Sequence, residues 1–235
     1  MVVNKDLKPL IPLLISACVL LLFSFGYRSG FGLFLQPMSQ ANGWGRDVFS
    51  MALAIQNLSW GVIAVLAGGL ADRYGSIRVL LAGILLYSSG MWAMSYATTQ
   101  WQIISSAGLM VGAGISGTSF GIVLHLLARA VPEHRRTWAL GLGTAAGSMG
   151  QFLMVPVMQE FIELFGWLQA LQYLGLSALL MALLVIPLVP YSSIENNSAN
   201  TVEGSLLSIL IRALKVRSYV LLVLGFFVCG FHITL

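Results

Sequence analysis

The stretch LIPLLISACVLLLFSFGYRSGFGLFL occupies residues 10–35 and contains a single charged residue, Arg28. A helix needs about 20 consecutive apolar residues to cross the roughly 30 Å hydrocarbon core of a bilayer. This stretch therefore predicts a transmembrane helix that is retained in the mature protein. Five more apolar segments of spanning length follow, at residues 49–71, 79–97, 103–128, 138–159 and 167–189. Together they predict an all-α, polytopic membrane protein.

Composition excludes the main alternative classes. Only 9% of the 235 residues are charged, against about 25% in soluble domains, and 58% are apolar. The apolar runs are continuous, whereas an outer-membrane barrel needs short alternating stretches. The basic residues fall in short gaps between spans, so no nucleic-acid partner is expected. Cys18 and Cys229 lie within apolar runs, and we expect no metal site and no cofactor.

The pattern of spans predicts three regions. Residues 1–190 form a bundle of six transmembrane helices, and residues 191–217 form a polar linker with a short amphipathic helix at 206–214. Residues 218–235 begin a seventh span that is barely long enough to cross. Because such a chain ends early in its seventh span, we expect a fragment or a truncated product.

The distribution of basic residues predicts the orientation in the membrane. With the amino terminus inside, ten of the twelve Lys and Arg residues fall in cytoplasmic segments, and Arg46 alone falls outside. The twelfth, Arg28, lies within the first span. We therefore expect a multi-pass protein of the inner or plasma membrane, with the amino terminus and the 191–217 linker in the cytoplasm.

The segment between the second and third spans reads GGLADRYGSIR, residues 68–78. It resembles the signature loop of the major facilitator superfamily: a glycine, three residues, Asp-Arg, one residue, a glycine, then basic residues. The matching positions are Gly68, Asp72, Arg73, Gly75 and Arg78, and Ser76 and Ile77 depart from the usual basic pair. The resemblance implies a conformational or gating role for the five matching residues.

Looser motifs are similar to one branch of this superfamily. YRSGFGLFLQP at residues 27–37, GWGR at 43–46 and the glycine pattern of the fifth span are similar to the branch of monocarboxylate transporters and oxalate/formate antiporters. This branch implies a secondary transporter of small organic anions that works by alternating access. It also implies that the chain is the N-terminal half of a twelve-span fold. We expect the half to need a second six-helix half, and not to transport alone.

Arg28 is the strongest candidate for substrate contact. A guanidinium in mid-membrane costs roughly 2.5–3.5 kcal/mol on insertion scales, and none of the first six predicted spans contains Asp or Glu. Such a charge favours an anion, and its planar fork suits a carboxylate. The adjacent Tyr27 and the intramembrane amides Asn57 and Gln151 complete the predicted substrate site. The alternative is that Arg28 reaches the outer surface or pairs with a segment outside this chain.

Other functions are less well supported. Gly147-Ser148-Met149-Gly150 superficially resembles the nucleophile of an intramembrane serine protease, but neither His125 nor His232 is expected near Ser148. We therefore expect no enzymatic activity. A channel subunit or non-transporting membrane scaffold is a second alternative. Within carriers, a drug or sugar transporter is the closest competitor, although this half offers a cation rather than the acids that grip sugar hydroxyls.

Overall fold

In the computed structural model, the residues described are 10–191, 215–218, 220–221 and 223–225. The chain divides into two compact units, Met1–Asn197 and Ser198–Leu235. The described part of the second unit includes a helical segment from residue 217. The predicted amphipathic helix at 206–214, and most of the linker and the seventh span, lie outside the described residues.

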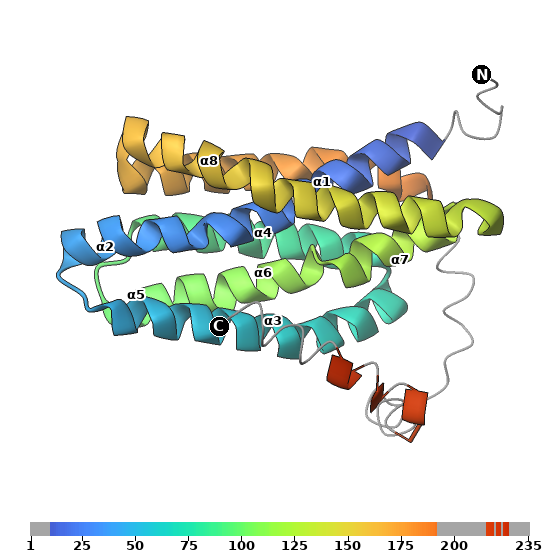
Figure 1. The fold of residues 1–235 in the computed structure, drawn as a ribbon, viewed down its shortest axis with the longest axis horizontal. Coiled ribbons are helices and arrows are strands. Elements are labelled where there is room, and N and C mark those ends of the chain that lie inside the picture. Colours follow the sequence, from blue (N-terminus) through green and yellow to red (C-terminus); the bar gives the residue numbers. More distant parts are fainter. Residues whose placement is uncertain (1–9, 192–214, 219, 222, 226–235) are drawn as a thin grey trace. The chain divides into compact units, whose positions relative to one another are not determined.

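The described part of the first unit consists of helices joined by short turns, and contains five helical stretches apolar enough to cross a membrane (Figure 1). The first runs from Ile11 to Asn42 and joins α1 (Ile11–Gly30), η2 (Phe31–Phe34) and α2 (Leu35–Asn42). It is 32 residues long, or about 48 Å at 1.5 Å per residue. The helical stretch therefore continues to Asn42, past residue 35, where the first span was predicted to end.

The second and third spans are joined by one residue. Helix α3 covers Arg46–Tyr74, and α4 covers Ser76–Ser95. Gly75 between them has φ 91°, a left-handed conformation that glycine adopts without steric cost. Within the predicted inter-span segment 68–78, only Gly75 separates the two helices, because this single glycine reverses the chain, and the other motif residues occupy two helix ends.

The fourth span is interrupted. It runs through α5 (Gln100–Ile103), the π-helix η3 (Ile104–Met110), α6 (Val111–Gly117) and α7 (Phe120–Ala130). A capping box between Thr99 and Gln102 begins it. The break after α6 is held by the Thr118 hydroxyl, which lies 2.8 Å from the Ser24 hydroxyl of α1.

The last stretch, Glu133–Tyr191, contains both remaining predicted spans in α8 (Glu133–Leu180) and η4 (Met181–Leu188). A straight helix of its 59 residues would measure about 88 Å, nearly three bilayer cores. Gly166 interrupts the helix with φ 76° and ψ 160°, and divides it into two legs. Phe161 and Phe165 of the first leg pack against Tyr173 of the second, with ring centroids 6.4 and 5.2 Å apart. The first unit is thus a six-helix bundle.

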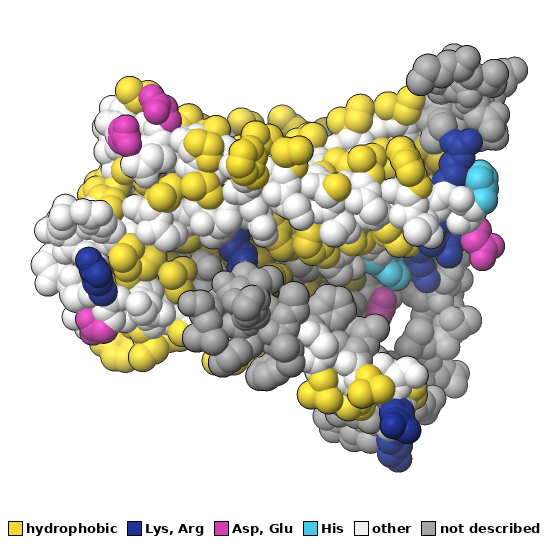
Figure 2. All heavy atoms as spheres, viewed as in Figure 1, with side chains coloured by type: hydrophobic (Ala, Val, Ile, Leu, Met, Phe, Trp, Pro, Cys, Tyr) yellow, Lys and Arg dark blue, Asp and Glu magenta, His cyan; other side chains and the backbone are white. Residues whose placement is uncertain are grey.

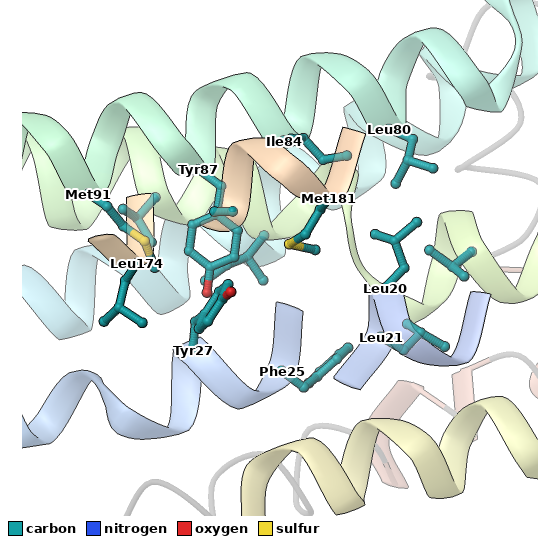
Figure 3. Packing of buried hydrophobic residues seen from close by; sticks show 14 of the residues in the cluster. Leu20, Leu21, Phe25, Tyr27, Leu80, Ile84, Tyr87, Met91, Leu174 and Met181 are labelled. Atoms are coloured by element: carbon teal, nitrogen blue, oxygen red, sulfur yellow. The ribbon is translucent and has the colours of Figure 1, made fainter. Parts of the chain in front are cut away.

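Helix α1 lies within the core of the unit. Figure 3 shows Leu20, Leu21, Phe25 and Tyr27 of α1 among side chains from α4, α8 and η4. Close backbone approach helps to form this core: a Cβ added at Gly150 of α8 would collide with the carbonyl of Leu22. Small residues at such contacts allow transmembrane helices to pack by dispersion forces, since burial in lipid gives no hydrophobic gain.

Helix α3 is the least covered span. Only 28% of its most apolar window is buried, against 67% for Gln100–Ala130. Between its charged ends, α3 exposes large apolar side chains, which include Met51, Leu58, Val62, Val65, Leu66 and Leu70. Figure 2 shows hydrophobic side chains over much of the visible face, with most charged side chains near its ends. This distribution fits a bundle that spans a membrane.

Candidate functional site

Arg28 lies near the middle of the first apolar helical stretch. It is the eighteenth of the 32 residues in Ile11–Asn42, so it lies about 26 Å from one end and 21 Å from the other. Its half-buried side chain reaches across to α3, where Nη2 donates a hydrogen bond of 2.9 Å to Oδ1 of Asn57. The guanidinium carbon lies 4.6 Å from the ring centroid of Trp60, within range of a cation–π interaction.

Among the residues that the structure describes, no carboxylate pairs with the Arg28 guanidinium. Nε of Arg28 is buried and has no hydrogen-bond partner in the part of the chain that the structure describes. No ion pair to Arg28 is formed within the described residues either. Because guanidinium groups only donate, Asn57 must present its oxygen to Arg28, and its amide N–H groups point elsewhere. An anion beside this pair could accept hydrogen bonds from both side chains.

Aromatic rings hold Trp60 in place behind the guanidinium. Phe25 meets Trp60 edge to face, with centroids 6.2 Å apart and an interplanar angle of 73°. Phe120 of α7 stacks on Phe25, with ring centroids 4.0 Å apart. Such packing fixes the ring that Arg28 covers, so the cation and its aromatic wall form a preorganised unit on α1 and α3.

The glycine turn places three charges at one end of the bundle. Asp72 and Arg73 lie in the last turn of α3, Arg78 lies in the first turn of α4, and all three are exposed. The Arg73 guanidinium lies 5.4 Å from the ring centroid of Tyr74. A Cβ added at Gly68 would meet no atom within 4 Å. This side of α3 therefore has room for another element to approach.

Comparison with known proteins gives the family. The sequence model of the Major Facilitator Superfamily matches residues 17–235. The chain belongs to this superfamily. Among curated relatives, it is 28% identical over 159 residues to monocarboxylate transporter 11 of Mus musculus, an alignment covering 65% of this chain and 34% of that protein. It is 27% identical over 180 residues to the 4-hydroxybenzoate transporter PcaK of Pseudomonas aeruginosa, covering 75% and 39%.

A third relative is the Danio rerio protein SVOPL, which is named as a transporter and is 28% identical over 181 residues, covering 76% of this chain and 35% of the relative. The chain thus spans roughly a third of the length of these curated relatives. The prediction that this chain is a major facilitator protein, with similarity to monocarboxylate transporters, is confirmed. So are the all-α membrane fold and the multi-pass insertion in a membrane.

The structure of this major facilitator chain separates the predicted substrate residues. Arg28 and Asn57 are in direct contact. Tyr27 faces another way: it is 1% exposed, its hydroxyl lies 2.9 Å from that of Ser177, and its ring meets Tyr87 edge to face at 6.2 Å (Figure 3). Successive residues of a helix point about 100° apart, which sends the Tyr27 ring into the core and the Arg28 side chain toward α3.

Gln151 lies on the first leg of α8, close to Ser29, the residue that follows Arg28. Its side chain is exposed, and its backbone carbonyl accepts a hydrogen bond of 3.2 Å from the Ser29 hydroxyl. The amide is therefore not in the hydrogen-bonded pair formed by Arg28 and Asn57, although it belongs to a helix packed on α1. A substrate role for Gln151 stays a prediction.

Trp60 is the site residue that sequence reasoning missed. It lies three positions after Asn57, a spacing that places both side chains on one face of a helix. That spacing was the available signal. Other polar residues of the major facilitator bundle serve helix packing instead: buried Gln56 donates 2.9 Å to the carbonyl of Ala107, and Ser116 donates 3.0 Å to that of Trp60.

Proposed function

We propose that this chain is the N-terminal half of a secondary active transporter of small organic anions, and that Arg28 contacts the substrate carboxylate. The single observation that carries the proposal is the position of Arg28: a permanent cation at the centre of an apolar helical stretch, with a buried Nε that has no acceptor among the described residues. A carboxylate would supply both the missing charge and the missing acceptor. Two relatives named for monocarboxylate and 4-hydroxybenzoate transport agree with this substrate class.

Asn57 and Trp60 give the proposed site its geometry. The amide N–H groups of Asn57 offer donors beside the guanidinium, and the Trp60 ring supplies an apolar wall for the rest of a small organic acid. Tyr27 and Gln151 do not contact this pair, and each would act from outside it. The buried Tyr27 would act by fixing the direction of α1, whereas Gln151 would reach the substrate from the first leg of α8.

The proposed mechanism is alternating access between two six-helix halves. In carriers built from repeats, the substrate site lies near the bilayer midplane, and one bundle rocks against the other around it. The poorly covered α3 and the open space beside Gly68 offer a surface for the second half. Gly68, Asp72, Arg73, Gly75 and Arg78 would then gate the cytoplasmic side. The proposed setting is the plasma or inner membrane, with the amino terminus in the cytoplasm.

A drug or sugar carrier is the alternative within the superfamily, and a non-transporting scaffold is the alternative outside transport. Neither accounts for a mid-membrane cation whose described partners are an amide and an aromatic ring. Hydrolysis at Ser148 has no support from the transporter relatives. We therefore propose that the protein transports its substrate without chemically changing it.

The decisive experiment measures uptake of radiolabelled monocarboxylates into proteoliposomes that contain this half joined to a second half. We expect Arg28→Gln to lower uptake at least 100-fold, since the charge-assisted contact is lost. Arg28→Lys should retain part of the activity, because it keeps the charge but not the fork. The matched control is Arg46→Gln, which removes an exposed arginine at the end of α3. Undiminished uptake by the glutamine variant at position 28 would refute the substrate role.

A further inference from the structure

An apolar groove of about 330 Å³ opens between α3, α4 and α6, at the end of the bundle where Gly75 turns the chain. Ile63 and Leu70 line it from α3, Val79 and Leu86 line it from α4, and Gly83 and Gly117 belong to its floor. The two glycines let α4 and α6 approach closely at the groove, since a Cβ added at Gly83 would lie 2.8 Å from Cα of Gly117. Among the described residues, no side chain fills the groove above them.

The polar groups of the groove lie at one end. Tyr74 and Arg78 line that end, and the remaining lining residues are aliphatic side chains or glycines. Arg78 is exposed, and no hydrogen bond or ion pair engages it within the part of the chain described here. Arg73 lies beside Tyr74 and adds a second cation near the opening.

The length of the groove matches one leaflet of a membrane. From Ile63 to Tyr74 the helix rises about 16 Å, close to half of the roughly 30 Å hydrocarbon core. A transmembrane helix of a partner would need a groove along the whole core. An acyl chain needs only one leaflet, and its phosphate would then lie at the level of Arg78.

We propose that this groove binds an acyl chain of an anionic phospholipid, whose phosphate is held by Arg78. Because acyl chains are equally apolar in the bilayer, selection depends on the fit of the chain over the glycine floor and on the charge at the opening. Basic residues at the membrane surface attract anionic lipids, so phosphatidylglycerol is favoured over phosphatidylcholine. The site is separate from Arg28 and does not depend on the proposed substrate.

The test is photolabelling of the 235-residue chain in nanodiscs with two probes, phosphatidylglycerol and phosphatidylcholine, each carrying a diazirine in its acyl chain. Peptide mapping should find the label on α3 residues 63–74 and α4 residues 78–86, at least threefold stronger for phosphatidylglycerol. Ala82→Phe fills the groove and should lower this labelling at least fivefold. Ala145→Phe is the matched control, at an exposed alanine of α8 that does not line the groove.

Arg78→Gln tests the headgroup contact without changing the packing, because the side chain is exposed. It should remove the preference for phosphatidylglycerol, whereas Arg136→Gln, at an exposed arginine of α8, should preserve it. Arg28→Gln should leave labelling unchanged, which separates this proposal from the transport proposal. Equal labelling by both probes in the unaltered chain would overturn the proposal, as would undiminished labelling of Ala82→Phe. Absence of label from the groove peptides, as expected if a protein segment fills the groove, would also overturn it.

Discussion

Arg28 and the arginines beside Gly75 carry the same charge in opposite surroundings. Arg28 lies in the middle of a span, donates to Asn57 and covers Trp60. Arg73 and Arg78 lie exposed at a helix junction, where Arg73 has a nearby tyrosine ring. A buried cation must be held by specific groups because its desolvation is costly, whereas a cation at the membrane surface keeps its hydration. The difference supports the binding role that we propose for Arg28 and separates it from the gating role that we propose for Arg73 and Arg78.

The strongest test of this difference is to give Arg28 a counter-ion. In Asn57→Asp, a carboxylate replaces the neutral amide 2.9 Å from Nη2. We expect affinity for a monocarboxylate to fall by about 10- to 100-fold, because the new acid occupies the guanidinium and repels the anion. Equilibrium binding of labelled substrate to the transporter measures the change. Asn57→Ala, which removes the amide without adding charge, is the control and should have the smaller effect.

The aromatic wall should matter less than the charge. Trp60→Leu removes the ring 4.6 Å from the guanidinium while keeping an apolar side chain. A desolvated cation–π contact of about 1–2 kcal/mol corresponds to a loss of roughly 5- to 30-fold in affinity. The same binding assay measures it. If Trp60→Leu binds substrate as tightly as the parent protein, Arg28 is oriented by Asn57 alone.

At the turn, the expected effect is on stability rather than on binding. Gly75→Ala forces a Cβ into φ 91° and should cost about 1–2 kcal/mol in the free energy of unfolding. Gly68→Ala is the comparison within the same motif: it lies inside α3 beside open space, and should gain about 0.5–1 kcal/mol from helix propensity. Thermal unfolding of the detergent-solubilised protein distinguishes them. Equal melting temperatures would mean that the backbone at Gly75 is not strained.

The smallest effect is expected at Arg73. Replacing it with Gln removes an exposed cation whose described contact is the Tyr74 ring at 5.4 Å. We expect a change below about 0.5 kcal/mol in the free energy of unfolding, since exposed charges are well screened. Chemical denaturation provides the measurement. A larger loss would show that the motif arginines are structural, and would remove the contrast with Arg28.

The apolar segments were sufficient to predict the six helices, because the length of a span is set by the thickness of the bilayer. Their ends were less predictable. A single glycine reverses the chain at residues 75 and 166, and no composition shift marks a turn of one residue. The π-helical segment in the fourth span was also not predicted, because it arises where the span packs on α3 and Gly108 meets Ala52 and Ile55.

Within the candidate site, the charged and polar residues were easier to predict than the directions in which the side chains point. Arg28 and Asn57 could be found because a cation and an amide are conspicuous in an apolar span, and the structure places them together. Tyr27 was included as the neighbour of Arg28 in a motif, but adjacent helical positions point to different sides. Trp60 was missed because an aromatic residue is common in an apolar span, and its three-residue spacing from Asn57 was the sole signal that set it apart.

The reversal at Gly166 has a mechanical consequence. One non-helical residue joins the two legs of this hairpin, and three aromatic rings pack against one another across the bend. Because the connection is so short, we expect that a displacement of one leg near Gly166 also displaces the other.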